Sequence, residues 1–343
     1  MRPVVVEAFA RALSVILDPS HKQDYIPWFW DYHGSLVRKE KLLKIVRAFD
    51  DNFNLARIEP AGKIILDAGC GFGIPSLLIS LMGAQEVHGI EIFQPMVNTF
   101  AKFLTFLPSV KGIYPKWGDV VKTGYPGNSF DFVLSNEALS HYYDIPGFLQ
   151  EAWRVLKPGG ILFISDGNNG ANPWRVWSTH RVWDRFENGP SGPIYHHKVE
   201  MPYRELRANI VQEEFPDFTA DEVIALIAGT FGYTKAQVLE AARVYQESHT
   251  LPKSYYRYGQ ACPVHPMIAQ YIERLIYPCE LDHQLREVGF RYRIYAHAGG
   301  AGGNSAVRAV NAIVQALSPL TWPVGRGLRV VAQKGGAAGS GNT

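Results

Sequence analysis

Short apolar runs alternate with helical patterns through the middle of the chain. The predicted buried strands are near-continuous hydrophobic stretches at residues 64–66, 87–90, 130–134 and 161–165. The predicted helices between them cover residues 75–79, 94–107 and 146–156, and a weak strand precedes Gly118. Near-continuous apolar strands that alternate with helices are typical of a parallel sheet covered on both faces. The pattern therefore predicts an α/β core.

This alternation stops after residue 167 and returns near residue 279. The stretch between carries helical signals, including two capping-box patterns that begin at Thr219 and Thr234. Beyond it we expect, in order, a helix, a strand, a helix and a last strand, at residues 280–285, 291–295, 307–317 and 328–332. We therefore expect a helical insertion inside the α/β core.

The predicted boundaries divide the chain into four parts. They are an N-terminal helical segment (1–58), the core (59–167 and 279–334), the insertion (168–278) and a flexible tail (335–343). The first segment opens with an amphipathic pattern, which predicts a helix that packs either on the core or on a partner subunit. A homo-oligomer is therefore one of the alternatives. Glu7 and Arg11 interrupt that pattern, which argues against a secretory leader. No apolar run is long enough to span a bilayer, so stable membrane insertion is not expected.

The composition narrows the class of protein. Hydrophobic residues make up 47% and charged residues 19%, and the formal net charge is +2. A chain without a basic field is not expected to bind nucleic acid. Three scattered cysteines cannot form a disulfide framework, and a reducing cytoplasm is the expected compartment.

The segment ILDAGCGFG, residues 65–73, places a glycine-rich turn directly after the first predicted strand. A Walker phosphate loop needs Lys-Ser or Lys-Thr after its last glycine, whereas Ile74 and Pro75 follow here. A dinucleotide fingerprint reads G-x-G-x-x-G, and this turn reads G-x-G-x-G. Alone, the turn also fits a plain strand-to-helix connection without a ligand.

Acidic residues at three predicted strand ends favour a ligand. Asp67 ends the first strand, Glu91 ends the second 24 positions later, and Asp119 follows the third. Ligands of open parallel sheets bind at these carboxyl ends. Asp67 would repel a pyrophosphate and attract an ammonium or sulfonium, and Glu91 would accept both hydroxyls of a ribose. The set suggests a nucleoside with a positively charged amino-acid tail, which describes S-adenosylmethionine (SAM).

At this point the chain resembles a known family. The segments DAGCGFG, VHGIEI, GDV, FDFVLSNEALSH and LKPGGILFISD occur in the order and spacing of the class I SAM-dependent methyltransferases. The resemblance implies a Rossmann-like core with a mostly parallel seven-stranded sheet, closed by an antiparallel pair from residues 291–295 and 328–332. It implies SAM as cofactor and these cofactor-binding residues: Asp67, Gly69, Gly71, Gly73, Glu91, Ile92, Asp119, Val120 and Asn136.

The run that follows the fourth strand resembles a narrower group. Residues 137–144, EALSHYYD, are similar to a stretch of methyltransferases that act on sugars, sterols and quinone-like precursors. The resemblance implies that His141 is a base, with Glu137 and Asp166 as further catalytic residues. The alternative is that His141 caps the next helix or packs against Tyr142. We expect transfer to an oxygen of a small molecule, with carbon or nitrogen transfer, or a non-catalytic SAM-binding protein, as alternatives.

Three further features are given structural interpretations. Nucleic-acid amino-methyltransferases carry Asn/Asp-Pro-Pro-aromatic after the fourth strand, whereas this chain has Asn-Glu-Ala-Leu at residues 136–139. The insertion is expected to cover the acceptor, with most of its aromatic residues in its own core: Trp174, Trp177, Trp183 and Phe186. Polar residues near them are expected on the solvated surface: His196, His197, Arg204 and Arg207.

No metal is expected. One set has spacings compatible with zinc, namely Cys262, His265, Cys279 and His283. We expect structural roles for it, because spacing alone does not establish a tetrahedral site.

Overall fold

The computed structural model describes residues 3–335, which form two compact units. One unit runs to Leu139 and adds Asp144–Asn169 and the chain from Tyr277 onward. The other comprises Ser140–Tyr143 and Gly170–Ile276. Most of the tail expected to be flexible, residues 336–343, lies outside the described residues.

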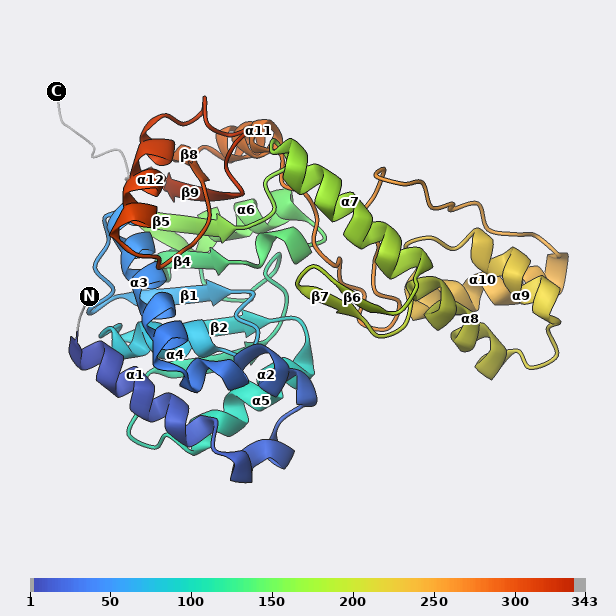
Figure 1. Cartoon of the computed structure of the whole chain (residues 1–343), viewed down its shortest axis with the longest axis horizontal. Helices are drawn as coiled ribbons and strands as arrows, with labels where there is room; N and C mark the ends of the chain where they lie inside the picture. Colours follow the sequence, from blue (N-terminus) through green and yellow to red (C-terminus); the bar gives the residue numbers. More distant parts are fainter. Residues whose placement is uncertain (1–2, 336–343) are drawn as a thin grey trace. The chain divides into compact units, whose positions relative to one another are not determined.

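The first unit is built on a seven-stranded sheet (Figure 1) with the order β3-β2-β1-β4-β5-β9-β8. Its strands are β1 (Ile64–Ala68), β2 (Glu86–Glu91), β3 (Ile113–Trp117), β4 (Phe130–Asn136), β5 (Leu156–Asp166), β8 (Arg291–His297) and β9 (Gly327–Gln333). Strands β1 to β5 pair in parallel, and β9 runs antiparallel to both β5 and β8. The Rossmann-like fold class and the antiparallel closing pair are confirmed.

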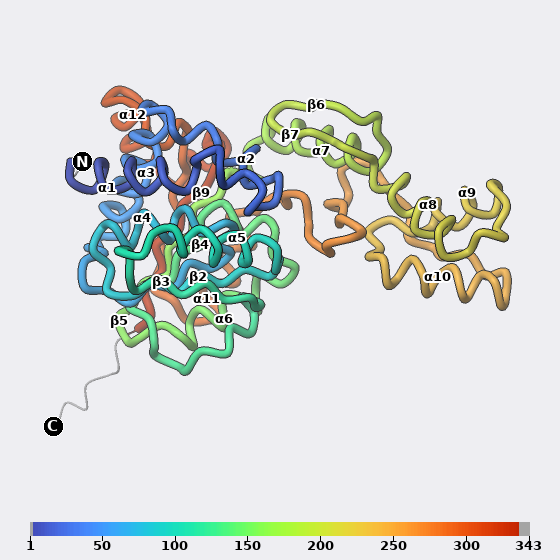
Figure 2. The backbone as a smooth tube through the Cα atoms, turned by 90° about the horizontal axis from the view of Figure 1, so that it is seen from below, coloured from blue at the N-terminus to red at the C-terminus, as the bar shows by residue number. Residues whose placement is uncertain are grey.

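Helices cover both faces of this sheet. Figure 2 shows α1 (Pro3–Ile16) and α3 (Lys39–Ala56) on one side, and α6 (Ile145–Val155) and α11 (Pro278–Val288) on the other. The remaining elements of this unit are η1 (Pro19–Asp24), α2 (Pro27–His33), η2 (Gly34–Val37), α4 (Ile74–Leu81), α5 (Gln94–Thr105) and α12 (Ser305–Ala316).

The amphipathic N-terminal helix packs on the core of this unit. The α1 side chains Phe9, Leu13 and Ile16 are buried in one apolar cluster with residues of α3, α4 and β1. Burying such side chains stabilises the fold by about 1.5–3 kcal/mol each. Among the described residues, no helix is long and apolar enough to cross a membrane.

The second unit is mainly helical. Residues 140–143, which precede α6 in the sequence, also belong to it. Its helices are α7 (Pro173–Asn188), α8 (Tyr203–Glu214), α9 (Ala220–Ala228) and α10 (Lys235–Ser248). The predicted capping box at Thr219 is confirmed, since Glu222 N–H donates to Thr219 Oγ1 and Thr219 N–H donates to Glu222 Oε2. This reciprocal pair satisfies N–H groups that the first turn of α9 leaves open.

Two expectations for this unit were wrong, and one of its elements was not predicted. A two-stranded antiparallel hairpin, β6 (Gly192–Ile194) with β7 (His197–Val199), interrupts the helices, because strands of three residues are too short to show alternation. Trp174 and Trp177 are 65% and 42% exposed and do not lie in a core.

Arg207 is 1% exposed instead of solvated. It donates to Glu187 and, over 3.1 Å, to Thr230 Oγ1. A buried charge persists only when it is paired in this way, and sequence spacing does not reveal a partner twenty positions away.

Candidate functional site

The glycine turn between β1 and α4 places each of its three glycines in the left-handed region of the backbone. The φ angles of Gly69, Gly71 and Gly73 are 70°, 54° and 74°. A Cβ at Gly73 would lie 2.4 Å from the ring of Phe100, so no side chain fits there. Pro75 occupies the first turn of α4, as expected. The glycines thus let the chain turn tightly and leave its backbone exposed to a ligand.

Asp67 is the penultimate residue of β1, and it is buried, with only 1% of its surface exposed. Its Oδ2 accepts a hydrogen bond of 2.6 Å from Ser76 Oγ, on the first turns of α4. Burial raises the pKa of Asp67 to about 7, against the opposing effect of the Ser76 hydrogen bond. A nearby cation would therefore favour the ionised form of this acid.

Glu91 ends β2 and reaches the same turn. Its Oε2 accepts the backbone N–H of Gly71 at 3.1 Å, and its Oε1 accepts the N–H of Phe93 at 2.9 Å. Two backbone donors fix the orientation of a carboxylate that is 8% exposed. The structure thus brings Asp67, Glu91 and the glycine turn together at the carboxyl ends of β1 and β2.

The two carboxylates and the glycine turn fit SAM. Residues 67–76 carry no lysine or arginine, whereas two acids lie against the turn, so a positively charged amino-acid tail is favoured over a diphosphate. The carboxylate of Glu91 suits ribose hydroxyls, which are donors.

An apolar edge lies beside Glu91. Ile92 and Trp117 are both exposed, and the indole Nε1 of Trp117 donates to the Ile92 carbonyl over 2.9 Å. Asp119 is half-buried and its Oδ1 accepts the N–H of Val121 at 2.9 Å, while Val120 is buried. The predicted adenine residues therefore lie at the ends of the neighbouring strands β2 and β3.

Polar residues also gather at the ends of β4 and β5. Asn136 is half-buried and pairs in register with Ser165. Glu137 has a φ of 51°, which is uncommon outside glycine, and its Oε2 accepts the N–H of Gly167 at 3.0 Å. Asp166 is buried, and its Oδ1 accepts the N–H of Asn168 at 3.0 Å. Glu137 thus links the chain that follows β4 to the chain that follows β5.

His141 belongs to the second unit, whereas Glu137 and Asp166 belong to the first. Its Nδ1 lies 2.9 Å from the carbonyl oxygen of Tyr271. A carbonyl only accepts hydrogen bonds, so Nδ1 carries the proton and a neutral ring has its lone pair on Nε2. The assistance of His141 by Asp166 stays a prediction.

Three side chains of the first unit were missed by sequence reasoning. Ser76 and Trp117 bond to predicted site residues, and their only signal was their place next to the glycine turn and the third strand. The third is Arg329 of β9, which is buried and donates to Ser165 Oγ and to His297 Nε2. Burial lowers the pKa of Arg329 to about 10 and that of His297 to about 3.

The residues with zinc-like spacing do not form a metal group. Cys262 and His265 lie in the second unit, whereas Cys279 and His283 lie on α11 of the first. Among residues 3–335, the potential metal ligands that do converge are different ones: His196, His197 and Glu273.

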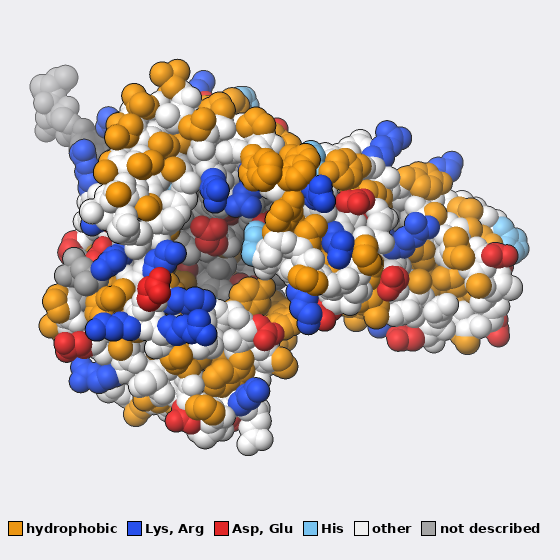
Figure 3. Space-filling model, in the orientation of Figure 1, with side chains coloured by type: hydrophobic (Ala, Val, Ile, Leu, Met, Phe, Trp, Pro, Cys, Tyr) orange, Lys and Arg blue, Asp and Glu red, His pale blue; other side chains and the backbone are white. Residues whose placement is uncertain are grey.

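Charged side chains of both signs are interspersed on the face drawn in Figure 3.

Comparison with protein families finds one matching model. Residues 66–164 match the methyltransferase domain, and this range runs from β1 to β5 and leaves out β9 and β8 at one end of the sheet. It contains the glycine turn, Glu91, Asp119 and Asn136.

Curated relatives resemble the same region. The chain is 36% identical over 109 residues to a 2-methyl-6-phytyl-1,4-hydroquinone methyltransferase of Synechocystis sp., covering 32% of this chain and 33% of that protein. A sterol 24-C-methyltransferase of Pneumocystis carinii is 35% identical, with 29% and 26% covered. A ubiquinone biosynthesis O-methyltransferase of Xanthomonas axonopodis pv. citri is 31% identical, with 41% and 56% covered. The matches thus span from about a quarter to about half of these relatives' lengths.

A solved structure is similar over more of the chain. An S-adenosylmethionine dependent methyltransferase from Mesorhizobium loti covers 83% of this chain and 97% of its own, with 15% identity and a TM-score of 0.44.

Proposed function

We propose that the whole chain is a SAM-dependent enzyme that moves the cofactor's methyl group to an oxygen of a small molecule, with His141 as the base, because residues 66–164 match the methyltransferase domain. The curated relatives are named for quinone, sterol and ubiquinone chemistry, which favours a small-molecule acceptor. The cofactor supplies a methyl group on a positively charged sulfur, and everything else must come from the chain.

In this proposal the first unit binds the cofactor. Glu91 accepts the ribose hydroxyls while its backbone bonds to Gly71 and Phe93 hold it in place. Asp67 attracts the ammonium group, and the glycine turn lets the amino-acid tail approach the backbone. Ile92 and Trp117 supply apolar surface for adenine, with Asp119 and Val120 at its edge. Asn136 contributes an amide at the end of β4.

The observation that carries the base assignment is the bond between His141 and Tyr271. The tautomer that it fixes leaves Nε2 of His141 able to take a proton from a hydroxyl as the new bond forms. A hydroxyl gains from such a base, whereas a neutral amine or a thiolate needs little beyond alignment and the exclusion of water. The orientation of His141 therefore favours an oxygen acceptor.

Glu137 and Asp166 are proposed as acceptor-side carboxylates. Each is held by a backbone N–H of the 167–168 segment, which orients one carboxylate oxygen of each residue. Asp166 would stabilise the positive charge that His141 gains with the proton, and Glu137 would bind a polar group of the acceptor. A carboxylate that stabilises an imidazolium raises the efficiency of the base.

Carbon transfer is the second candidate, because one of the relatives is named a sterol 24-C-methyltransferase. The two candidates separate in one experiment. Purified protein is incubated with methyl-labelled SAM and a panel of phenols, hydroquinones, sugars and sterols, and the position of the label is read by mass spectrometry and NMR. A labelled methoxy group supports the proposal, whereas a new carbon–methyl bond replaces it with the second candidate. No label in any acceptor, together with normal SAM binding, would favour a non-catalytic protein.

A further inference from the structure

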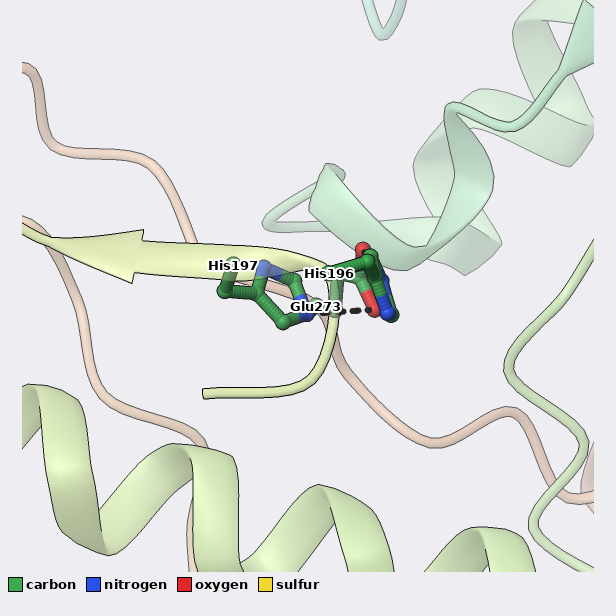
Figure 4. Close-up of side chains that lie close together, drawn as sticks. All are labelled: His196, His197 and Glu273. Carbon is green, nitrogen blue, oxygen red and sulfur yellow. Dashed lines mark ion pairs between the residues drawn. The ribbon is translucent and has the colours of Figure 1, made fainter. Parts of the chain in front are cut away.

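Two adjacent histidines and one glutamate converge inside the second unit (Figure 4). His196 lies in the turn of the β6–β7 hairpin, and His197 begins β7. Glu273 comes from the distant segment that precedes α11. These three residues lie outside the cofactor-binding turn and the proposed base, and the proposed function does not use them.

Contacts from α7 hold two of the three in place. The Trp183 indole Nε1 donates to the Glu273 carbonyl over 2.9 Å, which fixes the backbone of the acid. The ring of Phe186 packs edge-on against His197, with ring centroids 5.8 Å apart and planes at 86°. These two potential ligands are therefore positioned by the protein itself. His196 is 62% exposed on its side chain and leaves a path for entry from solvent.

The geometry of the three groups suits a shared ion. Each carboxylate oxygen faces a different imidazole, with 3.7 Å from Oε1 to His196 Nε2 and 3.8 Å from Oε2 to His197 Nε2. These separations are longer than hydrogen bonds. Ligand atoms about 2.0–2.2 Å from a zinc ion lie about 3.3–3.6 Å from one another in a tetrahedron. All three ligand atoms lie within 4.8 Å of one another, so side-chain adjustments well below 2 Å close the site.

We propose that His196, His197 and Glu273 form a binding site for one divalent transition-metal ion of the zinc class. Two imidazole nitrogens with one carboxylate oxygen are the ligand set of open zinc sites, which keep a position for water or a substrate atom. The set is less suited to magnesium or calcium, which prefer oxygen ligands throughout. The bound ion would also tie the β6–β7 hairpin to the 262–276 segment.

Two further groups, Arg175 and His141, lie close enough to His197 to act on it electrostatically. The positive charge of Arg175 opposes the ion. The carboxylate of Glu273 offsets that charge, because it is a direct ligand and the guanidinium is not. The site therefore binds the ion through Glu273 above all, and removing this single negative charge is the sharpest perturbation.

The test uses the full chain, freed of metal with a chelator and titrated with Zn²⁺ alone, and with Co²⁺ as a spectroscopic probe. We expect one ion per chain and visible d–d absorption with Co²⁺. Glu273→Gln and His197→Ala should each lower the affinity by ~100-fold or more, since even outer partners of metal ligands are worth 10–100-fold. If one of these variants fails to fold, His196→Ala, which alters the exposed ligand, replaces it and should also lower the zinc affinity.

His283→Ala is the matched control, because His283 also pairs with a glutamate, Glu287, at 3.3 Å, but with no third ligand. It should bind zinc as the unaltered chain does. SAM affinity, measured alongside, should stay unchanged in every variant, which separates this proposal from the methyltransferase proposal. The proposed metal site would be overturned if the unaltered chain bound no stoichiometric metal. It would also be overturned if the variants of His196, His197 and Glu273 bound zinc as tightly as His283→Ala.

Discussion

The carboxylate of Glu91 accepts the backbone N–H of Gly71 over 3.1 Å, so the acid at the end of β2 holds the glycine turn that follows β1. A residue proposed to bind the ribose therefore also shapes the turn proposed to receive the amino-acid tail. We therefore expect substitutions of Glu91 to affect both cofactor binding and local stability.

Gly73 tests the packing of the turn. Gly73→Ala should destabilise the protein more than Gly62→Ala, although both residues have nearly the same positive φ, 74° and 71°. The left-handed backbone costs about 1–2 kcal/mol in both variants. Only at Gly73 does the new Cβ also meet the ring of Phe100, which adds about 1–3 kcal/mol of overpacking. Urea unfolding measures the difference, and equal losses for the two variants would refute the close approach.

The raised pKa of Asp67 predicts how SAM affinity depends on pH. With a pKa of about 7 in the free protein, the acid gains its negative charge as the pH rises from about 6 to about 8. SAM affinity should therefore increase, by about eightfold between pH 6 and 7.5 from the ionised fraction alone. Above pH 8 the cofactor's own amino group loses its proton and the gain ends.

Asp67→Asn provides the control for this titration, because it keeps an acceptor for Ser76 but cannot ionise. Its affinity should be low and flat between pH 6 and 7.5, as measured by calorimetry. The stability of the free protein should depend on pH in the opposite direction to its SAM affinity. A carboxyl whose folded pKa lies above the ordinary 3.8 stabilises the free protein at low pH, and that contribution is lost as the pH rises through about 7. If the variant kept the full pH dependence, Asp67 would not be its source.

His141 tests the base. His141→Ala should lower the rate of methyl transfer by ~100-fold or more at neutral pH, because general-base catalysis contributes at least this factor. SAM affinity should be unchanged. The surface variant His283→Ala should keep full activity. Unchanged turnover of His141→Ala would leave His141 with the capping or packing role that the sequence also allowed.

The buried pair of Arg207 and Glu187 predicts a stability effect in the second unit. Arg207→Met leaves Glu187 as an uncompensated buried charge and should cost about 3–5 kcal/mol in urea unfolding. Arg204→Met, three residues away and exposed, should change stability little. Replacing both partners, with Glu187→Leu added, should recover much of the loss. A double variant as unstable as the single one would contradict the pairing argument.

The sequence predicted the core well because its central strands β1, β4 and β5 are mostly buried and apolar. Such runs, alternating with helices, favour a covered parallel sheet, and that arrangement places Asp67, Glu91 and Asp119 near strand ends. The element boundaries shifted slightly. Strand β5 starts at Leu156 instead of the predicted residue 161, because Phe130 of β4 already pairs with Leu156 across a register irregularity.

The second unit was harder to predict, since its decisive contacts join residues far apart in sequence. Arg207 finds Glu187, and Glu273 approaches His196 and His197 from a segment about 75 positions later. A histidine pair without its carboxylate looks like a solvated surface. Only the folded chain brings the third group to it.

The most direct test of the central claim is calorimetric titration of the purified chain with SAM, beside Glu91→Ala and the same-strand control Glu86→Ala. Glu86 is also a β2 carboxylate, but it pairs with His88 at 3.0 Å instead of reaching the glycine turn. The account predicts one SAM per chain, a loss of at least about tenfold in Glu91→Ala from missing charged hydrogen bonds, and an unchanged Glu86→Ala. No binding by the unaltered protein, or equal affinities for the two variants, would contradict it.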